Sequence, residues 1–141
     1  MADIVLAMSP EWLELILSGR KTAEFRRVMP KQIISGDWVY LYCKGYIHGR
    51  VRVADVCYGS SLVLARSFAK EGCIRLEDAL VYLHLAKSPG VIKLGEVQRN
   101  EYPVRWEGVG HPQNFIYLEK AELGWGGTEV PCSEDGKEGL V

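Results

Sequence analysis

Residues 19–27 hold the densest group of chemically capable side chains in this sequence, in the order Gly-Arg-Lys-Thr-Ala-Glu-Phe-Arg-Arg. A strand of period two puts Thr22, Glu24 and Arg26 on one face, with Lys21 at its start. The planar guanidinium of Arg26 and the compact ammonium of Lys21 can together bind an anion and a polar ring. A partly buried Lys beside other cations also loses its proton more easily, which suits acid–base work. An exposed strand with weak cross-strand ion pairs is the third interpretation, and pattern alone leaves all three open.

A helix must lie directly before this segment. Ser9 can cap it, Pro10 fits its first position, and Gly19 fits the left-handed residue that ends a helix. A short apolar strand over residues 3–8 precedes the helix, and a strand over residues 21–27 follows it. Lys21 therefore lies at the junction between this helix and the strand that follows it.

The rest of the chain alternates between strand-like and helix-like patterns. We expect strands at 38–43, 47–57, 91–98, 101–105 and 114–120, and helices at 61–70 and 76–86. About six strands and three helices predict an α+β fold, most economically a small β-barrel with helices packed around it. We expect one domain over residues 1–123, followed by an acidic, Gly-rich and mobile tail over residues 124–141.

The charge is unevenly distributed along the chain. The formal net charge is −1, from 17 Lys and Arg against 18 Asp and Glu, which excludes a histone-like polycation. Residues 20–52 carry eight basic and two acidic side chains, whereas residues 111–141 carry two basic and six acidic ones. If this domain binds an anion, the distribution favours residues 20–52 as the place.

Some classes of protein are disfavoured by what the sequence lacks. The four cysteines and three histidines have no metal-ligand spacing, so we expect no metal and no cofactor. The N-terminal residues lack the pattern of a signal peptide, and no apolar run is long enough to span a membrane. Free thiols without a signal peptide are typical of a cytoplasmic protein.

Three segments resemble a known family. Residues 16–26, Ile-Leu-Ser-Gly-Arg-Lys-Thr-Ala-Glu-Phe-Arg, resemble the signature of the ASCH domain, a branch of the PUA-like superfamily. The Gly-Asp-Trp-Val of residues 36–39 and the Pro-Gln-Asn-Phe-Ile-Tyr-Leu of residues 112–118 are similar to two further family segments. The resemblance covers about residues 3–120 and implies a PUA-like β-barrel with a cleft beside Lys21.

The resemblance also implies activities. RNA or nucleotide binding is the theme of the superfamily, some ASCH members hydrolyse N4-acetylcytidine, and nuclease activity is proposed for others. In the amidohydrolase branch, Lys21 and Arg26 have counterparts, but a Thr replaces Glu24 and a further Glu follows later. The nearest hydroxyl in this chain is Thr22, two residues early, and the later Glu corresponds loosely to Glu71.

We therefore predict a module that binds RNA, another single-stranded nucleic acid, or a nucleoside or nucleotide in a basic cleft. Its predicted binding residues are Lys21, Glu24, Arg26, Arg50, Arg52, Tyr46 and His111. The alternative is a small hydrolase of a modified nucleoside, or a ribonuclease, with Lys21, Thr22, Glu24 and Glu71 as catalytic residues. A protein partner that binds the acidic tail is a further hypothesis.

Overall fold

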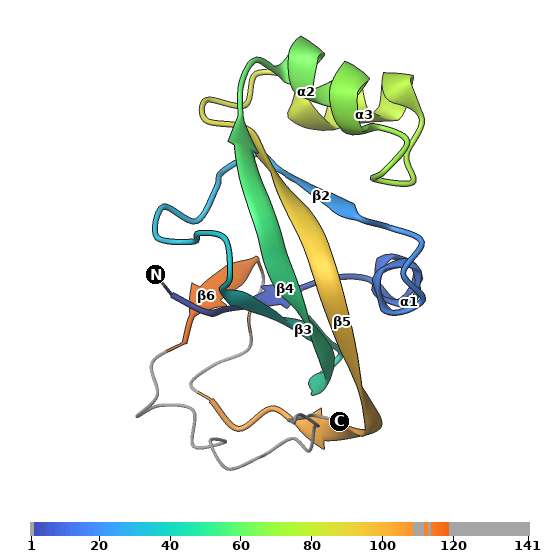
Figure 1. The fold of residues 1–141 in the computed structure, drawn as a ribbon, viewed down its shortest axis with the longest axis vertical. Helices are drawn as coiled ribbons and strands as arrows, with labels where there is room; N and C mark the ends of the chain where they lie inside the picture. Colours follow the sequence, from blue (N-terminus) through green and yellow to red (C-terminus); the bar gives the residue numbers. More distant parts are fainter. Residues whose placement is uncertain (1, 109–111, 113, 119–141) are drawn as a thin grey trace.

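The computed structural model describes residues 2–108, 112 and 114–118, and nine helices and strands lie within them (Figure 1). In chain order these are β1 (Ile4–Ala7), α1 (Pro10–Leu17), β2 (Ala23–Arg26), β3 (Trp38–Cys43), β4 (Tyr46–Tyr58), α2 (Ser61–Phe68), α3 (Leu76–Leu83), β5 (Gly90–Arg105) and β6 (Phe115–Tyr117). His111 and residues 124–141, singled out from the sequence, lie outside the described residues.

One six-stranded sheet, in the order β2-β5-β4-β3-β1-β6, curls into a half-barrel. Strands β1 and β3 pair in parallel, and the other neighbours are antiparallel. The long β4 and β5 form the spine of the sheet, with α1 beside it and α2 and α3 at one end (Figure 1). The predicted α+β class, the strand number and the barrel-like sheet with three helices are confirmed.

The prediction of separate strands at 91–98 and 101–105 was wrong, because β5 is continuous across them. The polar Arg99, Asn100 and Glu101 resemble a turn in the sequence. The sheet instead absorbs them through an irregular register opposite β4. Asn100 is buried there, and its side-chain amide donates a hydrogen bond to the carbonyl of Ile47 at 3.1 Å. A local polar run therefore did not end the strand.

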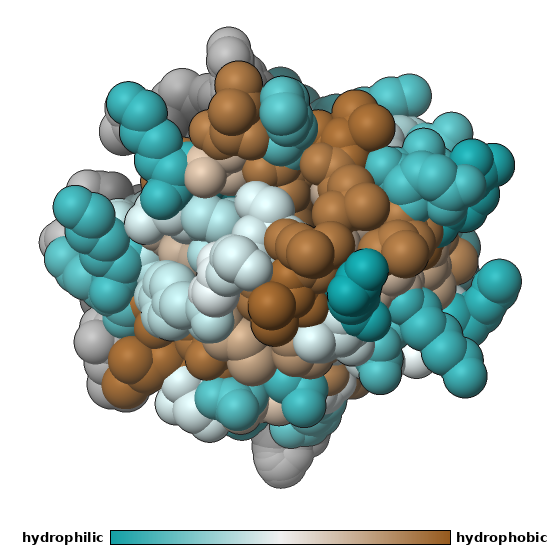
Figure 2. Space-filling model, turned by 90° about the horizontal axis from the view of Figure 1, so that it is seen from above, coloured by the Kyte–Doolittle hydropathy of each residue, from teal (hydrophilic) through white to brown (hydrophobic). Residues whose placement is uncertain are grey.

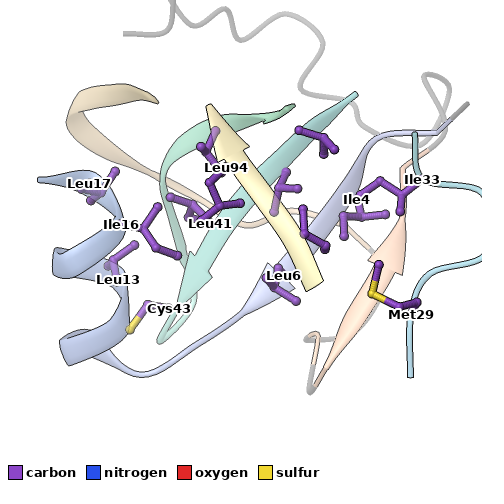
Figure 3. Packing of buried hydrophobic residues seen from close by; sticks show 14 residues of the cluster. Ile4, Leu6, Leu13, Ile16, Leu17, Met29, Ile33, Leu41, Cys43 and Leu94 are labelled. Atoms are coloured by element: carbon purple, nitrogen blue, oxygen red, sulfur yellow. The ribbon is translucent and has the colours of Figure 1, made fainter. Parts of the chain in front are cut away.

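The main core lies inside the half-barrel, and α1 seals one side of it. Leu13, Ile16 and Leu17 point from α1 toward the sheet, where they meet residues such as Leu41 and Leu94 (Figure 3). This places α1 next to the start of β2. Burying side chains of this size stabilises a protein by about 1.5–3 kcal/mol each, so the position of α1 is firmly fixed.

A second apolar cluster holds β2 from its other face. Ala23 and Phe25 pack there with Leu64 and Ala65 of α2 and with Ala79 of α3, among others. Both helices also expose apolar residues, and Figure 2, seen from above Figure 1, shows hydrophobic residues gathered at this end of the molecule. Strand β2 thus packs against the α2–α3 pair, whereas α1 packs against the sheet at β3 and β5.

The turn from α1 into β2 is built by backbone hydrogen bonds. Gly19 has a φ of +82°, as its predicted helix-ending role requires. The amides of Arg20 and Lys21 both donate to the carbonyl of Leu15. The amide of Thr22 donates to the carbonyl of Glu71 at 2.8 Å, which ties the turn to the loop between α2 and α3. Lys21 is therefore held just before β2.

No helix within the described residues is long and apolar enough to cross a membrane.

Candidate functional site

A cavity of about 190 Å³ lies where the end of β1, helix α1, strand β2, helix α3 and the loop before α3 meet. Its wall consists of Ala7, Met8, Trp12, Lys21, Glu24, Phe25, Arg26, Ile74 and Tyr82. Four of these, Lys21, Glu24, Phe25 and Arg26, belong to the segment over residues 19–27 that the sequence singles out. The charged groups lie together in a wall that is otherwise largely apolar and aromatic.

Lys21 is buried, with only 5% of its surface exposed. Its Nζ donates a hydrogen bond to the Gly72 carbonyl at 2.8 Å and lies 3.6 Å from a carboxylate oxygen of Glu24. The same Nζ lies 4.5 Å from the ring centroid of Trp12, within cation–π range. Burial lowers the pKa of Lys21 below the usual value of a lysine, and the negative charge of Glu24 opposes that shift. Lys21 therefore gives up its proton more readily than a surface lysine.

Glu24 lies between two cations. One of its oxygens faces Lys21, and the other lies 3.4 Å from Nη1 of Arg26. Arg26 is also buried, and its Nε has no hydrogen-bond partner among the described residues. Two buried cations thus share one carboxylate, and their contacts are longer than the 2.7–2.9 Å of strong charge-assisted hydrogen bonds.

Two neighbouring features fix the wall around these charges. The guanidinium of Arg27 donates hydrogen bonds to the carbonyls of Tyr82 and His84, which anchors the end of α3 and places Tyr82 at the cavity. A Cβ at Gly72 would lie 2.8 Å from the Phe25 ring, so this position has no room for a larger residue. Gly72 can therefore bring its carbonyl close to Lys21.

Arg50 and Arg52 lie on the other face of the sheet from Glu24. Val51 and Val53, which alternate with them on β4, are buried in the main core. Glu24 pairs with Ile92, a residue of that same core, so its side chain shares the core face. The sequence placed the two arginines with Lys21 in one cleft, whereas the structure separates them.

The two arginines contact protein groups on their own face. Their guanidinium carbons lie 3.8 Å and 3.9 Å from the Trp38 ring centroid. Arg50 also donates to Gln98 at 2.8 Å and to the Tyr40 hydroxyl at 3.0 Å. Much of the hydrogen-bonding capacity of Arg50 is therefore already used, and its contact with RNA stays a prediction.

The remaining predicted residues lie away from the cavity wall or outside the described residues. The side chains of Thr22 and Glu71 are exposed and do not line the cavity. Tyr46 lies at the start of β4, whereas β4 comes nearest to β2 around Asp55, because Asp55 and Ala23 both pair with Lys93 of β5. Nine residues of strand separate Tyr46 from Asp55, a distance of about 30 Å. The roles predicted for Thr22, Glu71 and Tyr46 stay predictions, as does that of His111.

Comparison with known proteins decides the family. A sequence model described as the ASCH domain matches residues 6–122, most of the chain. The chain belongs to the ASCH domain family. The matched residues include the whole cavity wall, so the Lys21–Glu24–Arg26 group is part of the ASCH domain.

Individual relatives agree with this membership. An ASCH domain-containing ribonuclease of Zymomonas mobilis subsp. mobilis is 26% identical over 136 residues, which are 85% of this chain and 86% of that protein. The crystal structure of ASCH from Zymomonas mobilis is 21% identical with a TM-score of 0.76, covering 86% of this chain and 90% of that one. The structure of a hypothetical protein is 22% identical with a TM-score of 0.53, covering 74% and 100%. The first structure supports the ASCH fold, and the hypothetical protein shares that fold at lower structural similarity.

Sequence reasoning missed several parts of this ASCH cavity. The Trp12 ring faces the Lys21 ammonium, a contact that the pattern of its helix does not indicate. Tyr82 lies in helix α3, whose sequence pattern indicates no functional site. Gly72, in the loop between α2 and α3, accepts the hydrogen bond of Lys21 through its carbonyl, and no sequence motif marks it. Only the contact between distant segments identifies these residues.

No group of three or more His, Cys, Asp or Glu side chains within the described part of this ASCH domain is placed to hold a metal ion.

Proposed function

We propose that this ASCH domain binds single-stranded RNA by taking one nucleotide into the cavity. The observation that carries the proposal is the buried group of Lys21, Glu24 and Arg26 in a wall that also contains aromatic rings. Cations attract the phosphates of a strand, and a carboxylate can accept a hydrogen bond from the amino group of a base. Aromatic rings offer stacking surfaces for an unpaired base.

The size of the cavity supports a single nucleotide rather than a longer segment. At about 190 Å³ it is smaller than the roughly 300–1,000 Å³ typical of drug-sized ligands. A duplex keeps its bases stacked and out of reach of such a cavity. Unpaired bases of a single strand can turn outward and enter it. The proposed ligand is therefore an unpaired stretch of RNA with one nucleotide inserted.

The test is a titration of labelled single-stranded RNA at low and moderate salt. Wild-type affinity should fall with salt, and Lys21→Met should weaken binding about tenfold. Arg20→Gln is the matched control, because it also removes one positive charge but changes an exposed residue outside the cavity wall. It should change affinity by less than about threefold. Absence of RNA binding at both salts, or equal effects of the two variants, would reject the proposal.

A ribonuclease is the second candidate. Its support is the similarity to the ASCH domain-containing ribonuclease of Zymomonas mobilis, together with a lysine whose pKa is lowered by burial. In such a reaction the ribose 2′-oxygen attacks phosphorus, and the bond from phosphorus to the 5′-oxygen breaks. A base must take the 2′-proton and an acid must protonate the leaving oxygen, and Lys21 and Glu24 are placed close enough to share these roles.

Cleavage assays separate the second candidate from simple binding. Wild-type protein that cleaves RNA in the presence of a chelator, while Lys21→Met does not, would establish the ribonuclease. Incubation with N4-acetylcytidine, followed by chromatography, tests the amidohydrolase alternative. The Thr22 hydroxyl does not line the cavity, so that reaction would need a different nucleophile, such as water. Intact substrate in both assays, with RNA still bound, would leave binding as the function.

A further inference from the structure

The charges in the cavity wall do not balance. Lys21 and Arg26 are positive, Glu24 is negative, and the other wall residues carry no charge. An excess of one positive charge therefore lies in a largely buried site. Burying an unpaired charge is costly unless something compensates it. A ligand with a negative group would supply that compensation.

The two cations are not equally compensated. Lys21 has the Gly72 carbonyl at 2.8 Å, the Glu24 carboxylate and the Trp12 ring. Among the described residues Arg26 has one carboxylate contact, at 3.4 Å through Nη1, and its buried Nε has no partner. Arg26 is therefore the cation that most lacks a negative partner. A guanidinium is also the side chain best matched to the oxygens of a phosphate.

We infer that the cavity is a phosphate-binding subsite, in which a nucleotide's terminal phosphate lies against Arg26 and its base lies toward the aromatic wall. This inference rests on the proposed function and names its ligand class. A nucleoside monophosphate and the phosphorylated end of an RNA strand both have this chemistry. An uncharged nucleoside leaves the excess positive charge uncompensated.

A terminal phosphate suits the cavity better than an internal one. An internal phosphodiester carries a nucleoside on each side, and both must fit around the phosphate. The small volume favours a group that enters from one end. A terminal phosphate also carries close to two negative charges at neutral pH, against one for a diester. A diester already matches the excess of one positive charge, and the second charge of a terminal phosphate adds attraction to the two cations.

The experiment measures the binding of cytidine and of its 5′- and 3′-monophosphates by calorimetry or NMR titration. We expect one of the monophosphates to bind at least about tenfold more tightly than cytidine, a difference of about 1.4 kcal/mol. Arg26→Gln should reduce that preference to less than about threefold. Arg20→Gln should retain it, because Arg20 is exposed and outside the cavity wall.

A second arm separates free nucleotides from strand ends. It compares one short RNA with and without a terminal phosphate on the 5′- or 3′-end. Tighter binding of a phosphorylated strand supports a strand-end site, whereas a preference confined to the monophosphates supports a free nucleotide as the ligand.

The outcomes distinguish this inference from the proposed function. If RNA binds in a Lys21-dependent way but no terminal phosphate improves affinity, the phosphate subsite is overturned and the RNA-binding proposal stands. Monophosphate binding without RNA binding would reject the proposed function and retain the subsite. If Arg26→Gln fails to fold, Arg26→Lys replaces it, because lysine keeps the positive charge and loses the planar pair of guanidinium donors. The comparison of cytidine with its monophosphates in the wild type tests the subsite without any variant. Equal affinity for all three ligands overturns the inference.

Discussion

Replacing Glu24 by Gln should destabilise the fold, because it leaves Lys21 and Arg26 facing each other without their shared carboxylate. Lys21 Nζ lies 3.6 Å from one oxygen of Glu24, and Arg26 Nη1 lies 3.4 Å from the other. The substitution keeps the size and shape of the side chain while removing its charge. The loss therefore reports on charge compensation rather than on packing.

The size of the effect follows from the geometry. Removing one partner of a buried ion pair costs about 3–5 kcal/mol. Both contacts here are long, and Glu24 retains 15% side-chain exposure, so we expect the lower end, about 3 kcal/mol. For a chain of this length that corresponds to a fall in Tm of roughly 10 °C. Glu96→Gln is the matched control, since it breaks an exposed pair with Arg52 and should cost less than about 1 kcal/mol.

The pH dependence has a definite sign. Burial lowers the pKa of Lys21 in the folded protein, and Glu24 counteracts this, so the substitution lowers the folded pKa further. The unfolded lysine titrates near 10.5, so the unfolded state holds more protons and stability rises with pH through the folded pKa. The part of the stability loss that arises from Lys21 is largest at pH values below the folded-state pKa of Lys21 in both the wild type and Glu24→Gln. It disappears above the folded pKa of the wild type.

Urea unfolding at several pH values between 6 and 10 is the assay, with the wild type and Glu96→Gln in parallel. We expect the Glu24→Gln deficit to be about 3 kcal/mol near pH 6 and to shrink toward alkaline pH. A deficit below about 1 kcal/mol, or one that grows with pH, would refute the reasoning that Lys21 and Arg26 depend on Glu24.

Three further predictions test the surroundings of the cavity. Gly72→Ala puts a Cβ 2.8 Å from the Phe25 ring, so it should cost about 1–3 kcal/mol in urea unfolding and weaken RNA binding by displacing the Lys21 acceptor. Arg50→Gln should lower stability by about 1–3 kcal/mol but affect RNA affinity less than Lys21→Met does; an equal effect would move the binding site to the outer face. Removing residues 124–141 should raise RNA affinity at low salt only, in titrations at two salts, because it removes acidic charge; unchanged affinity would contradict this.

Local patterns predicted the part of the structure that depends on neighbouring residues. The Ser9-Pro10 start and the Gly19 end gave α1 to within about two residues, because these signals depend on adjacent positions. Ser9 occupies the N-cap position, but its side chain makes no capping hydrogen bond, so that part of the prediction was wrong. The two-residue period of β2 put Glu24 and Arg26 on one face, and the structure joins them. This local logic was sufficient to find three charged residues of the cavity wall.

Contacts between distant segments could not be predicted in the same way. Arg50 and Arg52 share a basic stretch of sequence with Lys21, but which face of a curled sheet a strand presents depends on its partners. Trp12 of α1 and Tyr82 of α3 line the cavity, and Gly72 contacts Lys21, only because the fold brings these distant segments together. A charge count along the chain therefore located a segment of the cavity wall, but not which of the basic residues lie together on one surface.

An NMR titration of the isotope-labelled protein with short single-stranded RNA tests the central claim most directly. We predict that the largest shifts fall on the indole of Trp12 and on the backbone amides of Lys21 and Arg26, around the cavity. We also predict that these shifts are lost in Lys21→Met and retained in Arg20→Gln. Shifts that are instead centred on Trp38 and its neighbours on the other face of the sheet, or no shifts at all, would contradict the account.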